Sequence, residues 1–319
     1  MGASLVDTSP LPALSNGEHA LALIQRQTRR LAALQREVLA DGDPEPLHQF
    51  RVSLRRLRTA LQQFAPALEL PDGVGSGRIA ALARRTGLCR DLDVLRQRLD
   101  SSLLPRLVSE ERQALRPALK RLQRERRLAF EAVSETLVSP RYLKLLARLG
   151  RWQQRPAFTS LGHQPLAEWL HEWHLPLSGA LYLDPGWQAS DPRSEELHSL
   201  RKRIKGVRYA LEHLVDLLDA PGQGWIAALK QAQGLLGDLH DLQVLEACLL
   251  DRPGQRPGGD LAGLRAELER QRVAVWGQWR PLAALLLLPE SRRALPALRP
   301  LPQAIPPPPS GEGAATAGS

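Results

Sequence analysis

The order of apolar and polar positions along this chain follows a helical period over most of its length. Apolar residues recur three and four positions apart, as on one face of an α-helix, and no run shows the alternation typical of a strand. We therefore predict an all-α fold. The expected helices cover residues 17–40, 45–69, 75–103, 107–136, 139–153, 164–183, 193–219, 223–250 and 259–285.

Residues that start or stop helices lie between these segments. Asp43-Pro44 and Asp191-Pro192 each offer an N-cap carboxylate followed by proline at the first helical position. The segments 71–73, 221–222 and 251–260 contain the proline and glycine that interrupt helices. Beyond residue 298 the chain is mostly Pro, Gly, Ala and Ser, so we predict a disordered Pro-rich tail over 299–319.

The most informative feature is an internal repeat with an offset of 150 residues. His48 falls on His198, and a later Gly-x-x-x-Asp-Leu block at Gly87 matches the one at Gly237 without a change of offset. The matching apolar pairs are Leu47/Leu197, Phe50/Leu200, Leu54/Ile204, Leu57/Val207, Leu61/Leu211 and Phe64/Leu214. We infer two copies of one helical unit, related by a pseudo-twofold axis, at residues 15–155 and 156–298.

Each copy carries a row of basic residues on the flank of its apolar face. At about 100° per residue, the row beside His48 covers an arc of about 80°. The rows consist of His48, Arg51, Arg55 and Arg58, and of His198, Arg201, Lys202, Lys205 and Arg208. Like charges at helical spacing destabilise a helix, so we expect a fold that keeps this row twice to use it for holding an anion. The alternative is a solvated basic face neutralised by acidic neighbours.

Two acidic residues recur beside these rows. Asp91 and Asp241 lie within apolar runs at equivalent positions of the repeat. We expect each of them to pair with Arg or His of a neighbouring helix and to hold that side chain in place. An acid–base role in catalysis is the weaker alternative.

Composition narrows the class of partner. The 319 residues are 43% hydrophobic and 24% charged, which is ordinary for a globular protein with a sizeable core. The net charge of +9 favours an anionic partner such as nucleic acid, polyphosphate or an anionic membrane surface. Arginine provides most of the positive charge, and its guanidinium binds oxyanions bidentately. Cys89 and Cys248 lie in apolar helical patterns, where buried free thiols are expected.

No targeting or membrane signal is visible. The first residues lack a basic region and a long apolar run, and the apolar run between Pro281 and Pro289 is too short to span a bilayer. We expect a cytoplasmic protein without a membrane partner.

The repeated blocks also match a known family. LHQFRVSLRRLRTAL (47–61) with GLCRDLDVL (87–95) resembles the first half of a CHAD domain, the conserved histidine α-helical domain. ELHSLRKRIKGVRYALEHL (196–214) with LLGDLHDLQVL (235–245) resembles its second half, and the resemblance covers about residues 15–290. It implies two pseudo-symmetric four-helix bundles whose basic helices line a shared groove or pore that binds inorganic polyphosphate.

The resemblance also implies the contact residues. Arg90 stands where the family has an arginine in its first half, and His240 takes the equivalent place in the second. The expected polyphosphate contacts are His48, Arg51, Arg55, Arg56, Arg58, Arg90, His198, Arg201, Lys202, Lys205 and Arg208. Many relatives carry an N-terminal CYTH triphosphate-tunnel domain, for which the few residues before the first helix leave no room. We therefore expect a stand-alone binding module without enzymatic activity, cofactor or metal.

Binding of this kind would rest on charge-assisted hydrogen bonds and counterion release, since polyphosphate has no bases to read. Affinity should rise with chain length and fall steeply with salt. Protonation of the histidines near their ordinary pKa should strengthen binding at mildly acidic pH.

Three other functions compete with this one. Nucleic acid is a weak competitor, because aromatic residues make up only 4% of the chain and stacking platforms need them among the basic residues. A di-metal helical-bundle enzyme is less favoured: Glu-x-x-His occurs at Glu45/His48, Glu168/His171 and Glu195/His198, but arginines occupy the flanks where further carboxylates are needed. A scaffold that coats polyphosphate granules would use the same basic surface.

Overall fold

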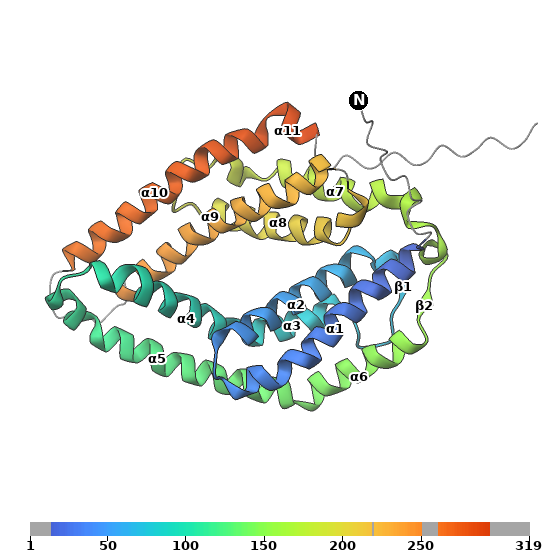
Figure 1. The fold of residues 1–319 in the computed structure, drawn as a ribbon, viewed down its shortest axis with the longest axis horizontal. Coiled ribbons are helices and arrows are strands. Elements are labelled where there is room, and N and C mark those ends of the chain that lie inside the picture. Colours follow the sequence, from blue (N-terminus) through green and yellow to red (C-terminus); the bar gives the residue numbers. More distant parts are fainter. Residues whose placement is uncertain (1–13, 219, 251–260, 294–319) are drawn as a thin grey trace, which may run out of the picture.

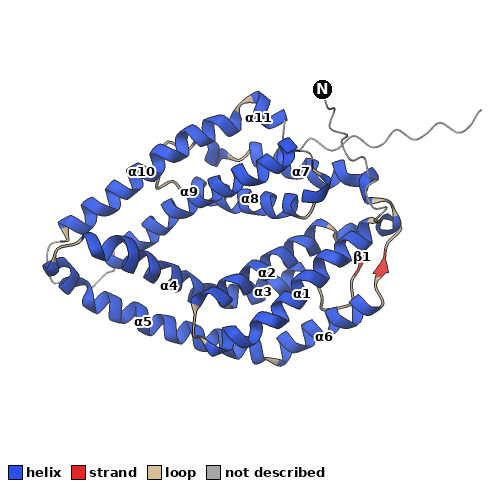
Figure 2. Cartoon of the chain, in the orientation of Figure 1, coloured by secondary structure: helices blue, strands red, loops and turns tan. Residues whose placement is uncertain are grey.

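The structure is a computed structural model that describes residues 14–218, 220–250 and 261–293. In this part of the chain almost every element is a helix, which confirms the all-α prediction (Figure 2). The helices are α1 (Asn16–Ala40), α2 (Pro44–Gln63), α3 (Ser76–Arg85), α4 (Gly87–Arg98), α5 (Ser109–Val138), α6 (Pro140–Gln154), α7 (Leu170–Tyr182), α8 (Glu195–Glu212), α9 (Ala220–Leu250), α10 (Ala262–Leu287) and α11 (Pro289–Arg293). The disordered tail and the loop at 251–260 were predicted for residues outside these ranges.

The helices form two groups that follow the order of the sequence (Figure 1). Helices α1 to α6 lie on one side of the molecule and α7 to α11 on the other, and α2 of the first group contacts α8 of the second. Two short strands, β1 (Leu68–Glu69) and β2 (Ala157–Phe158), pair antiparallel with Leu68 opposite Phe158. This pair, which the periodicity did not predict, joins the end of α2 to the chain that leaves the first group.

The helix boundaries confirm some of the predicted signals and correct others. Asp43 caps α2 as expected, because its carboxylate accepts the backbone N–H of Glu45. Asp191 does not cap α8; its carboxylate accepts the N–H of Arg193 in a preceding turn, and Ser194 is the N-cap. The segment 75–103 was predicted as one helix. In the structure α3 ends at Arg85, α4 follows from Gly87, and a π-helical turn covers 99–103.

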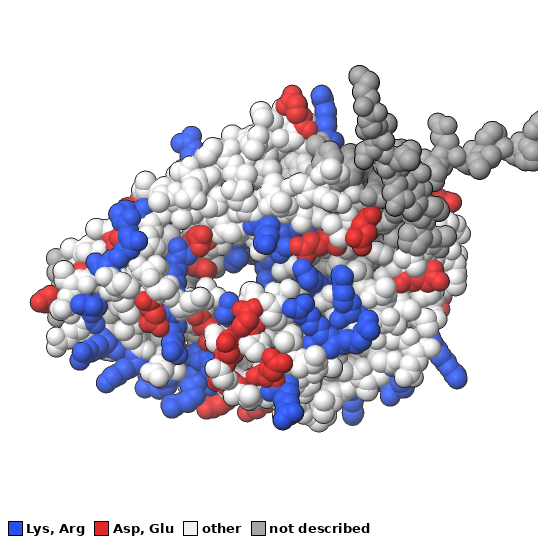
Figure 3. Space-filling model, in the orientation of Figure 1, with Lys and Arg blue, Asp and Glu red and all other residues white. Residues whose placement is uncertain are grey.

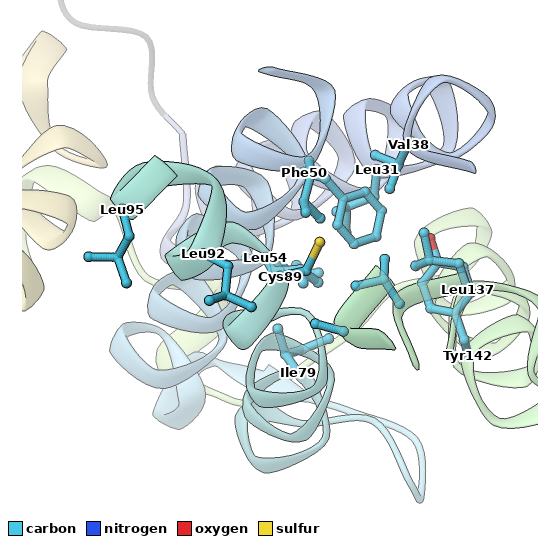
Figure 4. Packing of buried hydrophobic residues seen from close by; sticks show 14 of the residues in the cluster. Leu31, Val38, Phe50, Leu54, Ile79, Cys89, Leu92, Leu95, Leu137 and Tyr142 are labelled. Atoms are coloured by element: carbon cyan, nitrogen blue, oxygen red, sulfur yellow. The ribbon is translucent and has the colours of Figure 1, made fainter. Parts of the chain in front are cut away.

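The apolar faces of the two groups are buried in two clusters. Phe50 and Leu54 of α2 pack with Leu31, Cys89 and Tyr142 in the first cluster (Figure 4). All twelve residues of the matching apolar pairs are buried, with exposures of 4% or less: Leu47, Phe50, Leu54, Leu57, Leu61, Phe64, Leu197, Leu200, Ile204, Val207, Leu211 and Leu214. The two apolar stripes therefore serve the same purpose in α2 and α8, and they leave the flanking basic rows at the edge of the core.

Two long helices belong to both clusters. The first part of α9 packs into the second cluster through Leu229 and Leu236, whereas Leu245 in its last turns belongs to the first cluster. Helix α10 does the reverse, with Leu264 in the first cluster and Trp279 in the second. The core of the first group is thus completed by residues from the second half of the sequence.

The two cysteines are free, with Cys89 buried and Cys248 half-buried. Of the helices in the described ranges, none combines the length and the apolar character that crossing a bilayer requires.

Candidate anion-binding site

The contact between α2 and α8 brings the two basic rows together. Lys205 of α8 is half-buried, and its pKa falls to about 8 because of burial and the positive charges of Arg55, Arg201 and Arg51. Two of these arginines come from α2, so cations separated by the full repeat lie close enough to perturb one another. The pKa of Arg201 is lowered by burial, and Arg55 of the opposite helix adds to this effect. The rows therefore face each other across the junction of the two groups.

These cations are not neutralised by carboxylates. Within residues 14–218, 220–250 and 261–293, no ion pair joins a carboxylate to Arg51, Arg55, Arg201 or Lys205. Arg51 is positioned by neutral groups, since its Nη1 donates to the carbonyl of Ala83 at 2.6 Å and to Oγ1 of Thr86 at 3.1 Å. The buried Nε atoms of Arg51 and Arg201 have no hydrogen-bond acceptor in the described chain. The charges of these side chains are thus not balanced by direct carboxylate contacts among the described residues.

Asp91 and Asp241 affect the cations of the site through their charge, without direct contact. Asp91 raises the pKa of Arg51 and Asp241 raises that of Arg201, each against a larger effect of burial. Neither aspartate forms an ion pair with Arg or His among the described residues, so the expected direct pairing is not seen. Burial raises the pKa of Asp241 to about 6, although Arg98 and Arg201 oppose this.

One histidine of the second row, His198, lies beside His240 of α9. The rings of His198 and His240 are 4.4 Å apart between centroids at an interplanar angle of 32°. Burial, Arg201 and His198 lower the pKa of His240 to about 4, and burial with Lys202 lowers that of His198. In the first row, burial and the charge of Arg90 lower the pKa of His48. In the free protein each of these imidazoles is therefore harder to protonate than an ordinary histidine.

Two arginines of the predicted set are occupied elsewhere. Arg56 of α2 and Arg208 of α8 both pair with Glu212, the former at 2.9 Å between Nη2 and Oε2. Arg208 also donates from Nε to Gln233 at 3.1 Å and lies 4.4 Å from the ring centroid of Tyr209. These contacts brace α2 against α8. Glu212 was missed by the sequence reasoning, although its position four residues after Arg208 was a signal for this pairing.

The remaining predicted residues lie at the edge of the site. Arg58 and Lys202 are exposed, and Arg90 is half-buried and acts electrostatically on His48 and Arg51. None of the three forms an ion pair with another described residue. They widen the basic surface around the central cations.

A contact beside the site relates the two halves. Gln63 and His213 occupy equivalent positions under the offset of 150 residues, and their side chains are 3.0 Å apart between Oε1 and Nδ1. Equivalent residues contact each other only near a twofold axis, so this pair supports the inferred pseudo-symmetry.

The molecular surface is hollowed between the two groups of helices. Figure 3 shows this hollow near the centre of the face, with Lys and Arg side chains gathered around it and acidic side chains on part of its rim. In the part of the chain that the structure describes, no group of three or more His, Cys, Asp or Glu side chains comes together as a metal site. The di-metal alternative therefore has no support from this geometry.

Comparison with known proteins places the chain in a family. The CHAD domain profile matches residues 22–250, well over half of the sequence. The chain belongs to the CHAD domain family. This family is associated in general with polyphosphate binding.

Solved structures agree with this CHAD assignment. The CHAD domain from the plant Ricinus communis is 25% identical, with a TM-score of 0.67, and the match covers 93% of this chain and 99% of that one. PptA from Streptomyces chartreusis shares the fold at 16% identity and a TM-score of 0.65, over 85% of this chain and 99% of its own. No curated protein matches the sequence.

Proposed function

We propose that this CHAD domain protein binds inorganic polyphosphate in the hollow between α2 and α8. The observation that carries the proposal is the meeting of Arg51, Arg55, Arg201 and Lys205 from both helices without carboxylate partners. Two like charges about 4 Å apart repel by about 1 kcal/mol in water and by about 4 kcal/mol near a protein surface. A bound polyanion offsets this repulsion and accepts hydrogen bonds from the cationic side chains, so binding removes an unfavourable energy of the free protein.

The shape of the cation set favours a linear anion with many charges. The set extends from the exposed Arg58 and Lys202 to the half-buried Lys205, and a single phosphate group would contact only part of it. A chain of linked phosphates presents an oxyanion at each unit to successive cations and releases the counterions of both partners. Affinity should therefore rise with chain length and fall with salt.

We infer binding without turnover, since the proposed contacts are guanidinium, ammonium and imidazole groups that hold phosphate oxygens. Incubation with polyphosphate should release no orthophosphate above the level of a buffer control. Localisation at polyphosphate granules is a further part of the proposal, and a fluorescent fusion of the full chain tests it in cells that accumulate such granules.

The binding experiment compares the protein with Arg55→Glu/Lys205→Glu. Polyphosphate of several chain lengths is titrated at two salt concentrations, and the double variant should bind at least about tenfold more weakly, because losing even one charge-assisted hydrogen bond costs about 1.5–3 kcal/mol. The matched control is Arg141→Glu/Lys144→Glu on the exposed side of α6, which changes the net charge equally. Equal weakening by both variants would mean that only bulk charge matters. An absence of binding by the unaltered protein would refute the proposal.

Nucleic acid is tested in the same assay by competition. An RNA oligonucleotide with the same number of phosphates should displace polyphosphate poorly, because the described cations are not interleaved with exposed aromatic side chains for stacking. Displacement at equal concentration would favour the nucleic-acid alternative.

A further inference from the structure

We propose a second anion site on the outer side of α5, which binds another segment of the same polyphosphate chain. This inference rests on the proposed function, but it concerns different residues from the cations between α2 and α8. It assigns a ligand to a row of basic side chains that neither the repeat nor the central site explains.

The row runs along one exposed face of α5. Taking Arg116 as the reference and about 100° per residue, Lys120, Arg124 and Arg127 fall within an arc of about 80°. All four residues are exposed, and within the described ranges none of them forms an ion pair with a carboxylate. Figure 3 shows basic side chains gathered over the part of the molecule where α5 lies in Figure 1. Their mutual repulsion is unfavourable unless an anion lies along the row.

The surface beside this row is concave. A hollow of about 530 Å³ is lined by Arg96, Lys120, Gln123, Arg124, Arg126 and Arg127, which are five basic residues and one amide. A neighbouring hollow of about 510 Å³ extends it past Arg116 toward the end of α4, and Asp100 is the one carboxylate in its lining. Basic side chains that converge on a hollow can contact an anion from several sides, unlike those on a convex helix face.

Part of this lining is held in place by the fold. Arg126 pairs with Asp41 through both terminal nitrogens and with Asp93 at 2.9 Å from Nε, so two carboxylates more than balance its charge and hold it in position. Arg96 has only a loose contact with Asp100, 3.6 Å from Nε, and both side chains are exposed. The cations left for a ligand are therefore Arg96 of α4 and the row on α5.

The geometry fits a linear inorganic polyanion. From residue 116 to residue 127 the row spans about 16 Å at a rise of about 1.5 Å per residue. The linings of both hollows contain no aromatic side chain on which a nucleobase could stack. A chain long enough to occupy this row and the central site together binds with the avidity of two linked contacts, whereas a short chain occupies each site separately.

The test counts sites with a short ligand. Tripolyphosphate is titrated calorimetrically into the full chain, into Lys120→Glu/Arg124→Glu, into Arg55→Glu/Lys205→Glu and into the control Arg141→Glu/Lys144→Glu. We expect two equivalents for the unaltered protein and the control, and one equivalent for each of the other variants. With long-chain polyphosphate, the α5 variant should bind at least about tenfold more weakly and show a smaller dependence on salt, because fewer phosphates are neutralised.

The outcomes separate the two proposals. One equivalent in the unaltered protein, lost in the Arg55→Glu/Lys205→Glu variant and kept in the α5 variant, would overturn the second site and leave the proposed function standing. No binding in any protein would overturn both. A third outcome is that the unaltered protein binds an RNA oligonucleotide but not polyphosphate, and that Lys120→Glu/Arg124→Glu abolishes the RNA binding. The row on α5 would then be a nucleic-acid site and the inference would be wrong.

Discussion

Replacing Lys205 with arginine should abolish the loss of polyphosphate affinity that we expect between pH 7 and pH 9. Lys205 has a pKa of about 8, against an ordinary value of 10.5, because the half-buried ammonium is partly desolvated and lies near the charges of Arg55, Arg201 and Arg51. A bound polyanion stabilises the ammonium form, so the pKa of Lys205 in the complex must be higher than in the free protein. Affinity is then greatest below pH 8 and declines as the free protein loses this proton.

The size of the effect follows from the pKa. An amine with a pKa of about 8 is about nine-tenths protonated at pH 7 and about one-tenth protonated at pH 9. Affinity should therefore fall about tenfold between these two pH values, provided that the complex keeps the proton. The other perturbed groups do not titrate in this range: His240 has a pKa of about 4 and Asp241 of about 6. Arginine stays charged throughout, so the Lys205→Arg variant should show nearly constant affinity.

The assay is a titration with long-chain polyphosphate at pH 7, 8 and 9 and constant ionic strength. Calorimetry at pH 8 in two buffers with different heats of ionisation should also show uptake of about half a proton per site. Lys202→Arg is the matched control, since Lys202 is exposed on the same helix and should leave the pH dependence unchanged. Constant affinity in the unaltered protein, or an unchanged pH dependence in Lys205→Arg, would refute the reasoning.

Two further predictions concern the contacts that hold the site in place. Glu212→Gln leaves the half-buried Arg56 and the buried Arg208 without their carboxylate, and should reduce the free energy of unfolding by about 1–3 kcal/mol in urea denaturation; an unchanged midpoint would show that this brace is dispensable. Glu111→Ala removes the carboxylate that accepts the N–H groups of Gly263, at 2.7 Å, and Leu264, at 3.1 Å, at the start of α10. It should cost about 1–2 kcal/mol, whereas alanine at the exposed neighbour Glu110 should cost little.

The helical periodicity predicted most of the fold. The wrong helix boundaries arose where one stretch of sequence is compatible with two local structures. The apolar positions of α2 and α8 are buried as their spacing requires, because a stripe of that width must face a core. The end of α3 was missed, since the apolar period continues through Thr86 while the buried Thr86 side chain accepts from Arg51. Asp191 was assigned as a helix cap because a turn and an N-cap use the same side-chain chemistry, and the choice between them depends on Ser194 three residues later.

The sequence predicted which helix flanks carry the basic residues of the candidate site, but not which of these residues contact one another. The repeat placed two basic rows on equivalent helix flanks, but it did not separate residues that meet across the helices from those that pair locally. Arg56 and Arg55 are adjacent in sequence, yet one binds Glu212 and the other approaches Lys205. The low pKa of Lys205 arises from burial, from Arg201 on the same helix, and from Arg55 and Arg51 about 150 residues away, whose proximity a single sequence does not reveal. The concave surroundings of the row on α5 depend on Arg96 and its neighbours in α4, which the spacing within α5 alone does not reveal.

Helices α9 and α10 contribute to both apolar clusters, and this packing opposes a relative rotation of the two groups. A clamp closes by rotating two rigid bodies about a hinge, and such a rotation requires that few packed side chains cross the boundary. Here Leu245 and Leu264 anchor the second half of the chain in the first cluster, so opening the molecule would expose leucines that are now fully buried. We therefore expect the hollow to keep its width when a ligand binds. Ligand capture should then show one concentration-dependent phase in stopped-flow measurements, without a slower closing step.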